Sequence, residues 1–209
     1  MVKLRGPMFS LGASGSLADT LTFSVWKGRA YARQLVIPSN PGADKQLSVR
    51  AMMKWLSQNW STLAGADQLT WEDLAEAEVI SPFNAYIKNG LARWRNFLGP
   101  SEFYPPATID TPPVVDTGSA VGGVRMATVT MSMTTENQGT AVLFFRKTGS
   151  AVTAAFDNLV AVIPMAATAD VVFVDTPLVP ATYHYDFMTL THDGQLTDET
   201  QPVNAVVSA

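Results

Sequence analysis

The stretch from residue 20 to residue 60 constrains the fold most. It contains two segments whose side chains alternate between two faces, a tight turn between them, and prolines at 38 and 41 that end the second segment. Residues 21–26 alternate between two faces with the period of two that is typical of a strand. The Lys27-Gly28 dipeptide separates them from a second such segment, residues 29–37, which predicts a β-hairpin. Because an isolated two-stranded hairpin is only marginally stable in water, we expect helices or another subunit to cover one of its faces.

Three helices are predicted after the hairpin. The first spans residues 43–63, where apolar side chains recur at spacings that keep them on one helix face. The second runs from Thr70 to about Val79 and opens with acidic residues, which the helix dipole favours in a first turn. The third covers residues 81–98, with serine as N-cap, proline at the first helical position and glycine after its end.

The two halves of the chain differ in charge and composition, which predicts two domains. Residues 1–103 carry 11 Lys and Arg against 8 Asp and Glu, whereas residues 104–209 carry 3 against 10. A proline-rich stretch lies between the halves, and prolines favour an extended, semi-rigid spacer. The predicted division is a hairpin-helix assembly domain at 1–99, a proline-rich linker at 100–115 and a β domain at 116–209.

The second half carries short β-type segments separated by turn-rich links. The expected strands are residues 124–133, 140–146, 159–163, 170–175, 182–191 and 203–207. Such a number in about 100 residues favours an immunoglobulin-like or fibronectin-like sandwich. Residues 178–185 resemble the approach to the sixth strand of fibronectin type III domains, although the second strand lacks the tryptophan found in many of them. The predicted fold class is therefore an α+β N-terminal domain, with a β-hairpin and three helices, followed by an all-β immunoglobulin/fibronectin-like sandwich.

Composition excludes several classes of function. The net charge of −4 gives no global attraction to nucleic acid or anionic membranes. The chain has no cysteine, so it can form neither a disulfide nor a thiolate metal site. No apolar run reaches the roughly 18 residues that a membrane helix needs. We expect a protein made in a cytoplasm, with neither nucleic acid nor membrane as partner.

Three short motifs imitate those of serine β-lactamases and penicillin-binding proteins. They are Ser24-Val-Trp-Lys27, Ser57-Gln-Asn59 and Lys147-Thr-Gly149. The mechanism needs the first motif on the opening turn of a helix, whereas here it ends a predicted strand at a hairpin turn. We therefore predict a protein that is not an enzyme and keep a lactamase-type enzyme only as an alternative.

The histidines do not predict a metal site. His184 and His192 are the only two, and neither has a second ligand at metal-binding spacing. The glycine-rich residues 12–16 lack the Gly-Lys-Ser/Thr sequence that holds phosphates. We predict no catalytic residue, no cofactor and no metal.

The hairpin carries the clearest candidate for a binding surface. Alternation places Arg29, Tyr31 and Arg33 on one face of the second strand, with Lys27 at the turn. Trp26 lies on the strand face opposite Phe23, where it is available to contact a partner. These five partner-binding candidates favour a protein contact over nucleic acid, because three cations make few phosphate contacts. An ordinary solvated strand face is the alternative.

The ordered pattern from Gly15 to Pro41, together with Trp60, Trp71 and residues 83–88, resembles a family of small virion structural proteins of tailed bacteriophages. Members of that family are similar in having a β-rich C-terminal domain. The resemblance implies a virion protein that is made in the host bacterial cytoplasm and contacts other virion proteins, in many copies or as a homo-oligomer. A capsid decoration protein, docked by its N-terminal domain with the sandwich projecting, fits best. The alternatives are a neck or tail component, or a module that binds carbohydrate or the host surface.

Overall fold

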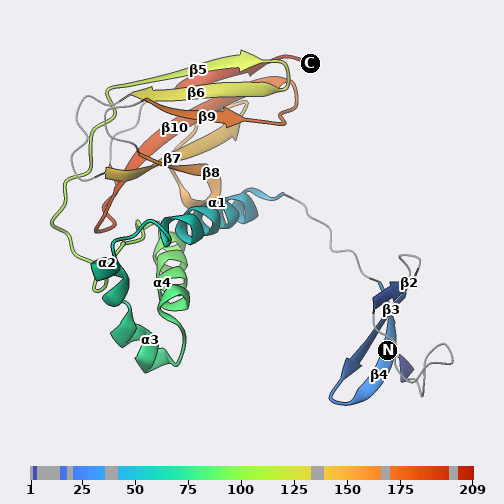
Figure 1. Ribbon diagram of the computed structural model, residues 1–209. Coiled ribbons are helices and arrows are strands. Elements are labelled where there is room, and N and C mark those ends of the chain that lie inside the picture. The colour runs from blue at the N-terminus through green and yellow to red at the C-terminus, as the bar shows by residue number, and fades with distance from the viewer. Residues whose placement is uncertain are drawn as a thin grey trace. The chain divides into compact units, whose positions relative to one another are not determined.

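The structure is a computed structural model, shown in Figure 1. It describes residues 2–3, 15–17, 21–35, 42–132, 139–165, 170–197 and 202–209. The chain divides into two compact units, residues 1–41 and residues 42–209, which we call the N-terminal unit and the C-terminal unit.

The N-terminal unit is a four-stranded antiparallel sheet with strand order β1-β4-β3-β2. The strands are β1 (Val2–Lys3), β2 (Gly15–Leu17), β3 (Leu21–Trp26) and β4 (Arg29–Gln34). The predicted hairpin is confirmed, since β3 pairs with β4 across Lys27 and Gly28. Both turn residues have positive φ, 50° and 73°, as the tightest hairpin turns require. The strands β1 and β2 were not predicted, because the first 19 residues carry little periodic pattern.

The C-terminal unit begins with four helices. They are α1 (Asp44–Asn59), α2 (Gly65–Leu69), α3 (Glu72–Glu78) and α4 (Pro82–Arg95). The three predicted helices are present, and the single turn α2 precedes the second of them. The hydroxyl of Ser81 accepts a hydrogen bond from the backbone N–H of Asn84 at 3.2 Å, which caps α4 as predicted. A Cβ at Gly90 would lie 2.9 Å from the side-chain methyls of Leu56, so this glycine lets α4 approach α1 closely.

Among the described residues, seven strands follow the helices and form two antiparallel sheets. One sheet has the order β5-β6-β9 and the other β11-β10-β7-β8. The strands are β5 (Thr117–Gly123), β6 (Met126–Ser132), β7 (Gly139–Thr148), β8 (Leu159–Pro164), β9 (Val171–Asp175), β10 (Ala181–Thr191) and β11 (Val203–Val207), with a short helix η2 (Phe156–Asn158) before β8. The six expected strands correspond to β6 to β11, while β5 was not predicted. A Cβ at Gly122 would lie 1.8 Å from the carbonyl oxygen of Val206, so only glycine permits this approach of β5 to β11.

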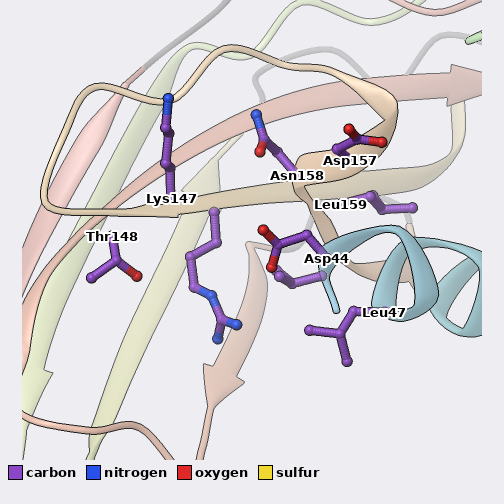
Figure 2. Close-up of a pocket in the computed structure, with 9 residues that line it drawn as sticks. Asp44, Leu47, Lys147, Thr148, Asp157, Asn158 and Leu159 are labelled. Carbon is purple, nitrogen blue, oxygen red and sulfur yellow. The ribbon is translucent and has the colours of Figure 1, made fainter. Parts of the chain in front are cut away.

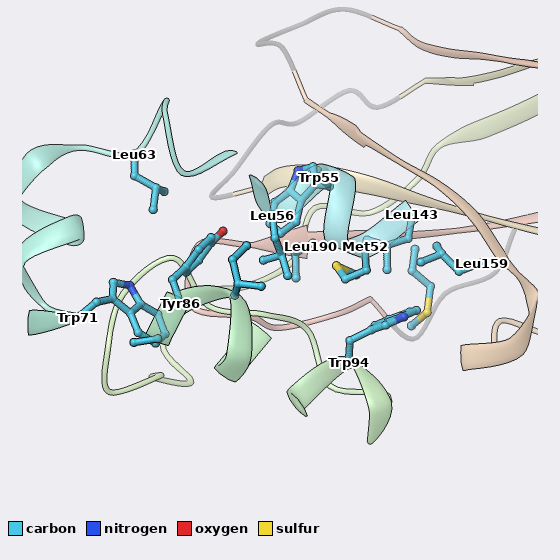
Figure 3. Packing of buried hydrophobic residues seen from close by; sticks show 14 of the residues in the cluster. Met52, Trp55, Leu56, Leu63, Trp71, Tyr86, Trp94, Leu143, Leu159 and Leu190 are labelled. Atoms are coloured by element: carbon cyan, nitrogen blue, oxygen red, sulfur yellow. The ribbon is translucent and has the colours of Figure 1, made fainter. Parts of the chain in front are cut away.

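The C-terminal unit has three layers, with the β11-β10-β7-β8 sheet in the middle (Figures 1 and 3). Alternate residues of β7 face opposite sides of this sheet. Leu143 and Phe145 pack with Trp94 and the other helical side chains, whereas Val142 and Phe144 pack with the second sheet. The central strands are therefore covered on both faces, and the helices share a core with the sheet.

The coarse fold class, α+β, agrees with the prediction, but the division of the chain does not fall where the sequence placed it. The compact units meet at residues 41 and 42, not at residue 99, because the helices and the strands bury one common core. The segment predicted as a linker is also bonded into the C-terminal unit. The carboxylate of Asp193 accepts backbone N–H bonds from Ile109 and Asp110 at 2.7 and 2.9 Å, and Thr189 donates to the carbonyl of Pro113 at 2.7 Å.

Candidate functional site

The five predicted partner-binding residues lie together on the N-terminal sheet. In the register of β3 and β4, Trp26 pairs with Arg29, Ser24 with Tyr31, and Thr22 with Arg33. Directly paired residues of antiparallel strands share a face, so Trp26 joins Arg29, Tyr31 and Arg33 on one side. The ammonium group of Lys27 lies 4.8 Å from the ring centre of Trp26, which is 62% exposed. We call Trp26, Lys27, Arg29, Tyr31 and Arg33 the basic-aromatic face.

The opposite side of the same two strands is apolar. Phe23 pairs with Ala32 and Val25 with Ala30, which places all four on this side. Val25 is 56% exposed and Leu21 is 40% exposed. Antiparallel sheets of soluble proteins normally bury one face. The sheet therefore presents apolar surface of the kind that partner contacts cover.

The lactamase-like motifs are not arranged for catalysis in their local structures. Ser24 lies on β3 and Lys27 in the turn after it, so neither stands on the opening turn of a helix. The side-chain amide of Asn59 donates to Glu102 at 2.8 Å and to the hydroxyl of Tyr86 at 3.3 Å. This asparagine therefore serves the packing of its own unit.

A polar pocket of about 260 Å³ lies between the start of α1, the end of β7 and the start of β8 (Figure 2). Asp44, Lys147 and Asp157 bring charges of both signs to its lining. Arg146 also lines it, but its guanidinium binds the carboxylate of Asp175 at 2.7 and 2.8 Å. The lining thus carries charges of both signs, and the guanidinium of Arg146 is already paired. The pocket therefore favours no particular class of ligand.

A polar junction around the buried Glu102 joins the helices, the proline-rich segment and the half-exposed His192 in the turn after β10. Glu102, 5% exposed, accepts a hydrogen bond from Asn59, and one of its carboxylate oxygens lies 2.5 Å from Nδ1 of His192. Its backbone carbonyl accepts from the indole N–H of Trp71 at 3.0 Å, and its backbone N–H donates to the carbonyl of His192 at 2.8 Å. Residues from three distant parts of the sequence thus meet at one carboxyl group.

The electrostatics of this junction indicate a structural role. The hydrogen bond to Glu102 raises the pKa of His192, against the opposing effect of burial. Burial raises the pKa of Tyr86, so its hydroxyl stays neutral. Within the described part of the chain, no group of three or more His, Asp or Glu side chains is placed to hold a metal.

A second exposed surface lies on α3 and the start of α4, where the sequence predicted a solvated acidic helix face but no binding residue. An open groove of about 900 Å³ there is lined by Glu72, Ala75, Glu76, Val79, Ile80, Ser81 and Pro82. A smaller hollow beside it shares Glu72 and Pro82 and adds Trp60 and Leu69. We call this continuous surface the acidic groove. The run of acids in the second predicted helix was its signal in the sequence. Strand alternation and the apolar stripe of a helix predict buried faces, so they do not assign a role to such a run.

Comparison with known proteins gives little further information. No protein-family model matches the chain, and no curated protein matches it. It is similar to a β-1,2-glucanase from Parabacteroides distasonis, with a TM-score of 0.37 and 15% identity over 50% of this chain and 14% of that chain. It is also similar to a family 76 glycoside hydrolase from a bovine Bacteroides thetaiotaomicron strain, with a TM-score of 0.36 and 10% identity over 46% of this chain and 20% of that one.

CopC from Methylosinus trichosporium OB3b is a further structural match, with a TM-score of 0.29 and 12% identity over 46% of this chain and 96% of that one. At TM-scores this low, the similarities carry no argument about fold or function. No helix among the described residues is long and apolar enough to cross a membrane. The surfaces of this chain and the residue pattern of its first half are therefore the best indications of its function.

Proposed function

We propose that this protein is a non-enzymatic structural component of a tailed-phage virion, docked into the particle by its N-terminal unit. The observation that carries the proposal is the sheet of that unit, which exposes an apolar face on one side and the basic-aromatic face on the other. A sheet with two exposed, chemically distinct faces is suited to contact other proteins. The residue pattern that resembles the phage family covers this same unit and the helices after it.

The charge of the two units supports an orientation in which the C-terminal unit projects from a particle. Residues 1–41 carry five Lys and Arg against one acid, whereas residues 42–209 carry nine against seventeen. A basic docking unit and an acidic projecting unit fit a capsid decoration protein. A neck or tail component is the alternative.

We further propose that the two sheets of the C-terminal unit form a fibronectin-like sandwich. Seven antiparallel strands in two facing sheets support this assignment. The hydroxyl of Tyr183 donates to the carbonyl of Val179 at 3.0 Å, which is the kind of corner contact that a tyrosine makes at this place in such domains. The helical layer over one sheet is an addition to that plan.

The alternative of a module that binds carbohydrate or the host surface needs exposed aromatic rings on the C-terminal unit. Tyr183 and Tyr185 are 4% and 0% exposed, and the ring of Tyr104 packs 5.4 Å from that of Trp71. A buried ring cannot stack on a sugar, so Tyr183 and Tyr185 supply no carbohydrate platform.

The proposal is tested by measuring how many copies of the chain each particle holds. Particles purified from lysates of the bacterium that carries the gene are digested and quantified by mass spectrometry. On the order of hundreds of copies indicates the shell or tail tube, and about a dozen or fewer indicates the neck or tip, because closed symmetry ties copy number to location. Absence of the chain from purified particles contradicts the proposal.

The docking role of the sheet is tested with the double variant Trp26→Ser, Arg29→Ser in the full chain. When it competes with wild-type chain, we expect its share in purified particles to fall at least about tenfold, because central aromatic and arginine contacts dominate interfaces. Arg95→Ser, an exposed change on α4, is the matched control and should enter particles normally. Equal entry of the double variant and the control contradicts docking by this sheet.

A further inference from the structure

The packing of the C-terminal unit does not explain the backbone conformation and the exposure of Val79 in the acidic groove. It ends α3 in the left-handed region, with φ 56° and ψ 46°, where glycine or asparagine is normally found. Its side chain is nevertheless 91% exposed, so this β-branched residue makes almost no contact that offsets the strain. A strained, exposed apolar residue indicates a role outside the unit.

The surface around Val79 combines an apolar floor with a negative rim. Leu69 is 60% exposed and Ile80 36% exposed, and Pro82 lies between the two hollows of the groove. The seven residues of α3 include four acids and no base. Lys88 binds Glu78 at 2.7 Å, whereas no described residue forms an ion pair with Glu72 or Glu76, both of which line the groove.

The basic-aromatic face of the N-terminal sheet has the complementary chemistry. Its two rings, Trp26 and Tyr31, match an apolar floor, and its three cations match a rim of carboxylates. Complementary charge of this kind steers association and fixes the choice of partner. The described surfaces of one chain thus offer both halves of a contact.

We infer that the acidic groove binds the basic-aromatic face of a second copy of this chain. This inference rests on the proposed function, in which the N-terminal sheet is the docking element, and it names the partner of that sheet. Each copy then uses its sheet in one contact and its groove in another. Such a head-to-tail contact is heterologous, so repeated copies close into a ring or extend as a filament.

The length of the chain favours a second copy over docking within one molecule. The segment from Leu35 to Gly42 spans at most about 25 Å when fully extended. The helix α1, about 24 Å long at 1.5 Å per residue, lies between Gly42 and the groove (Figure 1). A chain's own sheet is tethered by this segment, whereas the sheet of another copy meets no such limit.

The test is a mixing experiment with two full-length variants. The sheet variant is Trp26→Ser with Arg29→Glu, and the groove variant is Glu72→Lys with Glu76→Lys. Sedimentation velocity on each variant alone should show monomers, with self-association at least about tenfold weaker than in the wild type. A mixture should form heterodimers and stop there, because one partner keeps an intact groove and the other an intact sheet.

Val79→Asn separates binding from folding. Asparagine tolerates the left-handed region, so this variant should unfold at or above the wild-type temperature. It should still weaken self-association about tenfold, because the apolar contact is lost. Raising NaCl from about 0.05 to about 0.5 M should weaken the wild-type association through screening.

Several outcomes overturn the inference: wild-type chains that stay monomeric at all concentrations, variants that still assemble alone, or a mixture that stays monomeric. If the sheet and the groove of one chain bind each other instead, the mixture also stays monomeric, because mixing two chains cannot restore a contact within one chain. If the sheet variant fails to enter particles while the wild type never self-associates, the proposed function stands and the inference fails. If chains self-associate through the groove but are absent from particles, the inference stands and the proposed function fails.

Discussion

The strands β3 and β10 belong to the same class of secondary structure, yet they are supported in opposite ways. In β3, Leu21, Val25 and Trp26 are between 40% and 62% exposed. In β10, residues 185–191 are all buried, between a helical layer and a second sheet. The two regions therefore have different roles: the region around β10 stabilises the fold, and the sheet that contains β3 presents exposed surface.

The largest effect should come from removing a tryptophan on the buried side of this comparison. Trp94 is fully buried against Phe97, Phe145 and Phe156, and its indole N–H donates to Ser48 at 2.9 Å. We expect Trp94→Ala to lower the free energy of unfolding by about 3–5 kcal/mol, measured by urea denaturation. Trp26→Ala, the same change on the exposed sheet, should alter it by less than about 0.5 kcal/mol. Similar losses of unfolding free energy in the two variants would show that both regions contribute equally to the stability of the fold.

A smaller, pH-dependent effect is expected at the junction of the helices and strands. Glu102→Ala removes the acceptor of the half-exposed His192 ring and the nearer of the two acceptors of the Asn59 amide, which should cost about 1 kcal/mol at pH 6 because solvent screens the ion pair. The folded-state pKa of His192 is raised, so its stabilisation is fully present below its unfolded pKa of about 6.5. That stabilisation is lost as the pH rises through the folded value.

The cost of Glu102→Ala should therefore shrink between pH 6 and pH 9, as measured by thermal unfolding across that range. Glu76→Ala, an exposed acid on α3, should change stability little at any of these pH values. A cost that stays constant with pH would show that the histidine charge contributes nothing to the junction.

The smallest effect is expected when the whole N-terminal unit is removed. A chain that starts with methionine before Gly42 keeps the complete three-layer core. We expect its free energy of unfolding to match that of the full chain within about 0.5 kcal/mol, because separate sites contribute independently. Hydrogen exchange should show equal protection of β7 and β10 in both proteins. A loss of more than about 2 kcal/mol would show that the two units stabilise each other.

Much of the secondary structure was predictable, because it depends on local patterns. The hairpin of β3 and β4 follows from alternation across a Lys-Gly turn, and α4 follows from its Ser-Pro start and Gly-Pro end. The strand β5 escaped prediction because its sequence, Thr-Gly-Ser-Ala-Val-Gly-Gly, has low strand propensity. Close approach to β11 at Gly122 fixes it instead, and no local pattern reveals that contact.

The division into units was less predictable, because it depends on contacts between distant residues. The five successive apolar residues 141–145 do not alternate, which is the signature of a strand covered on both faces. That pattern indicates a layer on each face of β7, but it does not identify the helices as one of the two layers. The proline-rich segment has the composition of a spacer, yet Asp193, far along the chain, holds its backbone in place.

The candidate site was predictable in part for the same reason. Alternation alone placed Arg29, Tyr31 and Arg33 on one face, and the register of β3 added Trp26 to it. The acidic groove depends on the left-handed backbone of Val79, and valine is among the residues least expected to adopt it. Sequence patterns therefore reveal surfaces built on regular strands more readily than surfaces built on unusual backbone.

The three-layer core also determines the order in which the nascent chain can fold. The helical segment, residues 44–95, contributes Trp55, Trp71 and Trp94 to the core, but the strand face that buries them is completed only by β10. At bacterial rates of synthesis, on the order of 5–20 s separate the end of α4 from the end of β10. During that interval the ribosome holds a helical segment with uncovered tryptophans, which is a natural target for chaperones that bind emerging chains.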